Sequence, residues 1–169
     1  MLMFKLLGFV VTLLITWLVS AVAAPEVTPY FTTASGWQVF YHNGSGNCGM
    51  VRNHALGTEV IVTFDRSNDT WTFSLSNQKW DLVKNGQKYN VYMKLDGVDT
   101  WKGQFTGSVF NGRPIISLPN TKVEFIKKFM EGEKMTIGTP DSGDMTTLNL
   151  DGSWDAMLRV AECQKAHQS

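Results

Sequence analysis

The two cysteines of this sequence constrain its fold more than any other feature, because they are the only pair and lie far apart, at Cys48 and Cys163. Neither belongs to a C-x-x-C motif, so a redox-active role is not indicated. Two cysteines in an exported chain usually form one disulfide. Closing a loop of roughly 115 residues is worth about 4.7 kcal/mol in the chain-entropy model. We therefore predict a Cys48–Cys163 disulfide; two free thiols or an intermolecular disulfide are the alternatives.

The first residues are typical of a secretory signal peptide. Met1–Lys5 carries one positive charge, Leu6–Leu18 is almost unbroken apolar sequence, and Ala21-Val22-Ala23 has the A-x-A form of a cleavage site. Cleavage one residue later would leave Pro25 as the first mature residue, so cleavage after Ala23 is favoured. A retained membrane anchor is the alternative, but the apolar run is shorter than the roughly 20 residues that a bilayer span needs. We expect residues 1–23 to be removed and the mature chain to have no stable membrane insertion.

The charge balance argues against nucleic acid as a partner. The sequence has 15 basic and 15 acidic side chains, and Lys5 would be lost with the signal peptide. No run of basic residues is longer than Lys127-Lys128. Nucleic acids and anionic membranes are bound through a concentrated basic face, which this composition does not predict.

Alternation of apolar and polar residues predicts β-strands along most of the mature chain. The clearest stretch has Trp71, Phe73 and Leu75 separated by threonine and serine. Asn43-Gly44 and Asp96-Gly97 are typical hairpin turns. Short strands separated by such turns favour an antiparallel β-sandwich or barrel, and we predict about eight to ten strands.

Two segments change to helical periodicity. Thr121–Glu124 has the form of a capping box and precedes an apolar helical face. Ser153 is a favourable N-cap and predicts the start of a second helix. The predicted apolar face of that helix consists of Trp154, Met157, Leu158 and Ala161. We therefore predict a mainly β fold with two packed α-helices.

These patterns also predict the domain organisation. Residues 24–36 are expected to form an extended lead-in, because they are rich in proline, threonine and alanine. Residues 37–163 are expected to form a single β-rich domain, since no linker interrupts the strand pattern. Residues 164–169 are expected to form a polar tail.

Patterns for catalysis and metal binding are weak. The histidines are His42, His54 and His167, and no G-x-S-x-G motif of a serine hydrolase accompanies them. The six-residue spacing of His42, Cys48 and His54 does not match a metal site, and a disulfide would occupy the thiol. Asp141–Asp144 lacks the ligand pattern of a calcium loop. We expect no catalytic residue, metal or cofactor.

Trp80 and Trp101 lie near the only grouping of acidic residues, which consists of Asp81, Asp96 and Asp99. Trp80 falls in a polar loop and is expected to be exposed, whereas Trp101 falls on the apolar side of a strand, where core packing is the alternative. An exposed aromatic side chain is a candidate for recognition, so the two tryptophans form our candidate recognition surface. Aromatic residues beside carboxylates would also suit a sugar-binding face or a glycoside hydrolase.

Two polar turns match the N-glycosylation sequon. They are Asn43-Gly44-Ser45 and Asn68-Asp69-Thr70. The sequons matter only in a eukaryotic host.

A pattern at the C-terminal end carries a family resemblance. It is Leu148-x-Leu150-x-Gly152-Ser153-x-x-Ala156 followed by Cys163, preceded by an early cysteine and a strand that begins at Trp37. In these features the chain resembles the invasion-associated locus B family of small exported alphaproteobacterial proteins. The resemblance implies a periplasmic or surface-exposed, mainly β protein, associated with host-cell invasion and without a defined enzymatic activity. It assigns no functional residue, and the second cysteine pair expected of the family is missing here.

We therefore expect a secreted, non-enzymatic binding or accessory protein of the bacterial periplasm. Its partner would be a protein or a component of the cell envelope. One alternative is a cell-envelope hydrolase that uses paired carboxylates such as Asp96 and Asp99. Another is an inhibitor or immunity partner of an envelope enzyme.

Overall fold

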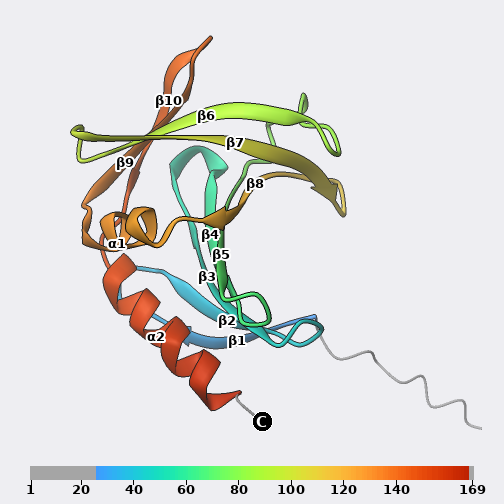
Figure 1. Ribbon diagram of the computed structural model, residues 1–169, viewed down its shortest axis with the longest axis vertical. Coiled ribbons are helices and arrows are strands. Elements are labelled where there is room, and N and C mark those ends of the chain that lie inside the picture. Colours follow the sequence, from blue (N-terminus) through green and yellow to red (C-terminus); the bar gives the residue numbers. More distant parts are fainter. Residues whose placement is uncertain (1–25, 168–169) are drawn as a thin grey trace, which may run out of the picture.

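The computed structural model describes residues 26–167, apart from the side chain of Asp99 (Figure 1). The proposed signal peptide, residues 1–23, lies outside the described residues. Neither helix within the described range has the length and hydrophobicity to cross a bilayer.

Ten antiparallel strands form a single sheet, in the order β1-β2-β3-β4-β5-β8-β7-β6-β9-β10. The strands are β1 (Val27–Thr32), β2 (Gln38–His42), β3 (Asn47–Asn53), β4 (Glu59–Asp65), β5 (Thr70–Ser76), β6 (Lys88–Leu95), β7 (Asp99–Phe110), β8 (Arg113–Thr121), β9 (Lys134–Thr139) and β10 (Gly143–Asn149). Two helices, α1 (Val123–Glu131) and α2 (Ser153–Ala166), complete the fold, with a short 3₁₀ turn, η1 (Ala55–Gly57), between β3 and β4. The predicted mainly β class with two helices is confirmed. The sheet is not closed into a barrel, because β1 and β10 remain its two edges.

The core lies on one face of this curved sheet. Cross-strand partners such as Met50 and Val62, and Val60 and Leu75, place their side chains on the same face, and all four are fully buried. Burial follows the period-2 pattern of the sequence in β4 and β6, as expected for a sheet with one apolar face, whereas in β5 all residues from Phe73 to Ser76 are buried.

Both helices pack on the apolar side of the sheet (Figure 1). Phe129 of α1 is fully buried, and its ring meets Trp37 at 5.9 Å and Phe73 at 5.6 Å between centroids. Helix α2 lies against β2 and β3. The two helices thus cover the core that the sheet leaves open.

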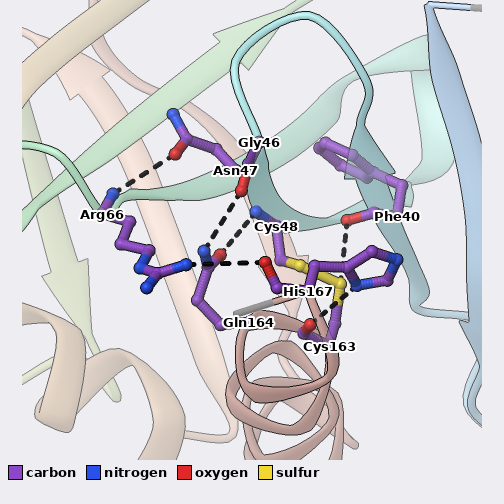
Figure 2. The surroundings of a disulfide bond; sticks show 8 residues. All are labelled: Phe40, Gly46, Asn47, Cys48, Arg66, Cys163, Gln164 and His167. Atoms are coloured by element: carbon purple, nitrogen blue, oxygen red, sulfur yellow. Dashed lines mark hydrogen bonds between the residues drawn. A yellow bond between two sulfur atoms is a disulfide. The ribbon is translucent and has the colours of Figure 1, made fainter. Parts of the chain in front are cut away.

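The predicted disulfide joins Cys48 of β3 to Cys163 of α2, with both side chains fully buried (Figure 2). The next residue of α2 strengthens this contact. The Gln164 side chain accepts a hydrogen bond from the Cys48 amide at 2.7 Å and donates one to the Gly46 carbonyl at 3.3 Å. Helix α2 is therefore held to the β2–β3 hairpin by a covalent bond and by hydrogen bonds.

Both predicted helix caps are wrong. The Thr121 hydroxyl donates to the Leu118 carbonyl at 2.6 Å and accepts from the Phe73 amide, so it belongs to the sheet rather than to α1. Ser153 is buried, and its hydroxyl donates toward the last carbonyls of α1, at Phe129 and Met130. Tertiary partners compete for these hydroxyls because both helix starts are packed against other elements.

The predicted apolar face of α2 is also wrong. Trp154 and Leu158 are both 51% exposed, and Ala161 is exposed as well. Of the predicted set only Met157 is buried. The buried face consists of Ser153, Ala156, Met157, Val160, Cys163 and Gln164.

The two ends of the domain are more ordered than the sequence suggests. Within residues 24–36, expected to be a lead-in, Val27–Thr32 forms β1 and pairs with β2. Helix α2 continues past Cys163 to Ala166, into the segment expected to be a polar tail. His167 follows, and its ring stacks on Tyr41 with a centroid separation of 3.9 Å.

Candidate binding site

Trp80 lies in the loop between β5 and β6 and lines two adjoining cavities. It is half-buried and packs against the core. The larger cavity has a volume of about 320 Å³, and core side chains of Val91, Ile116 and Ile137 contribute to its lining. The smaller one, of about 230 Å³, shares Trp80, Ile137 and Met145 with it. We call these two cavities the Trp80 groove.

Residues far apart in the sequence form the walls of the Trp80 groove. One wall comes from η1 and the following Thr58, a second from the loop of residues 77–87, and the third from the β9–β10 hairpin. Figure 1 shows this hairpin projecting beyond β6. The groove exists because the curved sheet brings its β10 edge close to the β3–β4 and β5–β6 connections.

A buried asparagine fixes the first part of the loop. The Asn77 side chain donates to the Leu56 carbonyl and to the Thr58 hydroxyl, both at 3.0 Å. Its oxygen accepts from the Lys79 amide at 2.9 Å. One side chain therefore ties η1 to the residues that precede Trp80, and a buried amide with its partners satisfied gives a well-defined geometry.

A tyrosine fixes the second part of the loop. The Tyr89 hydroxyl donates to the Leu82 carbonyl at 3.0 Å and accepts from the Lys84 amide at 2.9 Å. Backbone hydrogen bonds join Gly86 and Gln87 to Gly107 of β7. The loop around Trp80 is thus hydrogen-bonded at both ends, and the groove is preformed.

Three large apolar side chains at the groove remain exposed: Leu82 by 77%, Leu56 by 73% and Met145 by 49%. Leu56 has a φ of +63°, in the left-handed region that is uncommon for leucine. Met145 lies at the register shift between β9 and β10. Exposed apolar side chains gathered around a concave site are typical of a binding surface.

The lining of the groove is mostly apolar, and among the described residues only Lys79 and Asp81 bring a charge to it. The groove therefore offers an apolar interior with one group of each sign. It contains no arrangement of paired acids.

The other acidic residues of the predicted grouping do not join this site. The Asp96 carboxylate accepts hydrogen bonds from the backbone amides of Glu133 and Lys134, at 3.0 and 2.8 Å. It thereby holds the β6–β7 turn against the start of β9. The side chain of Asp99 lies outside the described part of the structure.

Trp101 lines a separate cavity. Its ring packs against Phe125 of α1 with a centroid separation of 5.6 Å, and the cavity beside it has a volume of about 210 Å³. The structure does not bring Trp101 and Trp80 together in one cavity. Leu56, Leu82 and Met145 were not predicted as site residues from the sequence. Leu82 could have been predicted, because it stands close to Trp80 in a polar loop.

Within residues 26–167, one group of three residues has the ligand types and proximity of a metal site. It consists of Cys48, Cys163 and His167, with ligand atoms within 4.8 Å of one another. The disulfide occupies both thiols, so these residues do not form a metal site in the oxidised protein.

No protein-family model and no curated protein matches the chain. The solved structures contain a related fold. The chain is similar to invasion associated protein B from Bartonella henselae. The two share 13% sequence identity with a TM-score of 0.58, over 76% of this chain and 94% of the other. The resemblance expected from the sequence is confirmed at the level of the fold.

Proposed function

We propose that the protein is a non-enzymatic binding module of the bacterial cell envelope, and that the Trp80 groove holds an apolar side chain of a protein partner. The observation that carries this proposal is the exposure of Leu56, Leu82 and Met145 around a preformed groove. Burying three such side chains in a complex would contribute about 1.5–3 kcal/mol each, before the cost of association. The protein of similar fold is described as invasion associated, which fits an accessory role.

An extended peptide is the occupant that fits best. Strand β10 is an edge of the sheet, so its outer backbone groups can pair with another strand. Met145 belongs to β10 and lines the groove, which places the open edge and the apolar cavities side by side. A peptide paired with β10 would gain main-chain hydrogen bonds while one of its side chains enters the groove.

Export to the periplasm is part of the proposal. It rests on the signal-peptide pattern of residues 1–23 and on a disulfide, which persists in oxidising compartments. Mass spectrometry of the exported protein should find a chain that begins at Ala24. A cytoplasmic chain that retains Met1 would contradict export.

Selection from a phage-displayed library of random linear peptides tests the groove. We expect the selected peptides to share a bulky apolar residue within an extended segment. Binding of a synthetic peptide, measured by calorimetry, should weaken about ten-fold or more in Leu82→Asp and Met145→Asp, because a charge would enter an apolar contact. Methylation of the peptide's backbone nitrogens should also weaken binding, since it removes donors to β10.

Val98→Asp is the matched control. Val98 is 82% exposed in the β6–β7 turn and does not line the groove. The same charge should leave peptide binding unchanged there. Equal binding by the wild type and both groove variants would refute the proposed site.

A further inference from the structure

The opposite face of β6 and β7 carries a second concave site, unrelated to the Trp80 groove. This cavity has a volume of about 730 Å³. Its floor is made by the outward side chains of the two strands, and Pro140 of the β9–β10 turn lies at its border. Because side chains alternate along a strand, the sheet itself separates this cavity from the core side where the Trp80 groove lies.

Three consecutive cross-strand pairs form the floor of the cavity. Asn90 pairs with Gln104, Tyr92 with Lys102, and Lys94 with Thr100. At the usual rise along a strand, this row extends over about 13 Å. It presents two amides, two ammonium groups, the Thr100 hydroxyl and the Tyr92 phenol to one side of the sheet.

Most of these polar groups have no partner within the described chain. The side chains of Asn90, Thr100, Lys102 and Gln104 make no hydrogen bond or ion pair with the described residues. Side chains without partners are available to a ligand, at an ordering cost of about 0.5–1.5 kcal/mol for each long side chain that becomes immobilised.

The local charge is positive although the protein as a whole is neutral. Lys94 and Lys102 line the cavity, and no carboxylate among the described side chains does. The Asp144 carboxylate on β10 accepts hydrogen bonds from Lys94 at 2.8 Å and from Tyr92 at 2.7 Å. These two donors hold the pKa of Asp144 below its usual range, so it remains a satisfied anion. Lys102 has no counter-charge among the described side chains.

A close backbone approach builds this arrangement. Tyr92 lies directly over Gly138 of β9, where a Cβ atom would collide with its ring and with the Gly143 carbonyl. The missing side chain lets the Tyr92 hydroxyl reach Asp144 on β10. The floor of the cavity is therefore fixed to the β9–β10 hairpin.

We propose that this face of β6 and β7 binds an anionic oligosaccharide of the uronic acid type, with a carboxylate at Lys102. Sugar hydroxyls both donate and accept hydrogen bonds, and the amides of Asn90 and Gln104 do the same. A carboxylate near Lys102 gains a charge-assisted hydrogen bond.

Two other anionic partners fit less well. The cavity lies over the outward side chains of the β6–β7 pair rather than at a strand edge, so an acidic peptide bound there would form no β-strand pair. A membrane surface would need apolar side chains at the site, and none of the exposed large apolar residues in the described chain lines this cavity. The face thus favours a ligand recognised through side chains alone.

Binding of hexagalacturonate to the intact, disulfide-bonded protein tests the proposal. Calorimetry at low ionic strength should detect binding that weakens as salt is added, while maltohexaose should not bind. Lys102→Gln should weaken binding about ten-fold, since one charge-assisted hydrogen bond is lost. Lys102→Glu should abolish it.

Lys165→Gln, on the exposed side of α2, is the control with the same change in net charge. It should leave the affinity unchanged. Vesicles containing phosphatidylglycerol, a poly-glutamate peptide and inorganic phosphate distinguish the other anions. The proposal is overturned if Lys102→Glu binds hexagalacturonate like the wild type, if maltohexaose binds equally well, or if vesicles, poly-glutamate or phosphate compete more strongly than the uronate.

Discussion

At the scale of single residues, several side chains have roles that only their distant contacts reveal. Asn77, which reads as an ordinary loop residue, is 6% exposed and connects η1 to the loop around Trp80. Asp96, which reads as a candidate catalytic acid, secures a turn through two backbone amides. Polar side chains near turns are common in any sequence, so their partners cannot be predicted from local pattern.

His54 predicts a pH dependence of stability. Burial, together with the neighbouring Arg52 guanidinium, lowers the pKa of His54 from 6.5 to about 4. Its Nε2 is buried and has no hydrogen-bond partner among the described residues. The unfolded chain binds this proton more tightly than the folded chain, so protonation of His54 favours unfolding. The free energy of unfolding therefore has its full value, as far as His54 is concerned, above pH 6.5 and decreases as the pH falls toward 4.

Urea unfolding at pH 7 and at pH 4.5 measures this effect. The loss in free energy of unfolding should be about 1–2 kcal/mol larger for the wild type than for His54→Gln, after allowance for the partial exposure of the ring. Contributions from carboxylates cancel in this difference. Identical pH dependence in the two proteins would show that His54 is not the responsible group.

At the scale of elements, the strands were predictable and the helix faces were not. The period-2 stretch from Trp71 to Leu75 lies within β5 as expected. In α2, two adjacent stripes of the helix are apolar, and hydrophobicity alone does not show which of them is buried. The sequence therefore predicted Trp154 and Leu158 as buried, whereas both are exposed. The disulfide at Cys163 and the buried Gln164 decide which stripe faces the sheet.

Substitutions in α2 distinguish the two stripes. Met157→Ala should lower the free energy of unfolding by about 2–5 kcal/mol, because it leaves a cavity in the core. Leu158→Ala removes a similar amount of apolar side chain from the surface and should change it by less than about 0.5 kcal/mol. Denaturant unfolding of both variants gives these values. A larger loss for Leu158→Ala than for Met157→Ala would reverse the assignment.

At the scale of the whole molecule, the disulfide connects the C-terminal helix to the third strand across 115 residues. Replacing both cysteines, as Cys48→Ala and Cys163→Ala together, should lower the free energy of unfolding by about 2–5 kcal/mol. Alanine leaves no buried thiol or hydroxyl unpaired. Thiol titration of the denatured, unreduced wild type should find no free thiol.

Peptide and oligosaccharide binding provide the control for this variant. Neither proposed site contains a cysteine, so at temperatures where the variant remains folded both affinities should match those of the wild type. Two free thiols in the wild type, or unchanged stability without the cysteines, would contradict the structural role of the disulfide.

The sequence by itself determined the β class, the main strands, the approximate places of both helices and the pairing of the two cysteines. Alternation, turn residues and a single cysteine pair are properties that can be read without knowing the fold. Trp80 was also a candidate from the sequence, because an aromatic residue stood in a polar loop.

The tertiary structure alone decided the strand order, in which β5 lies beside β8 and β6 lies beside β9. Both proposed sites depend on this order. The Trp80 groove needs η1, the β5–β6 loop and β10 to meet, and the polar face needs β6 and β7 in one register. Contacts between residues far apart in the chain depend on how the whole sheet curves around its core. Local pattern carries no information about that curvature.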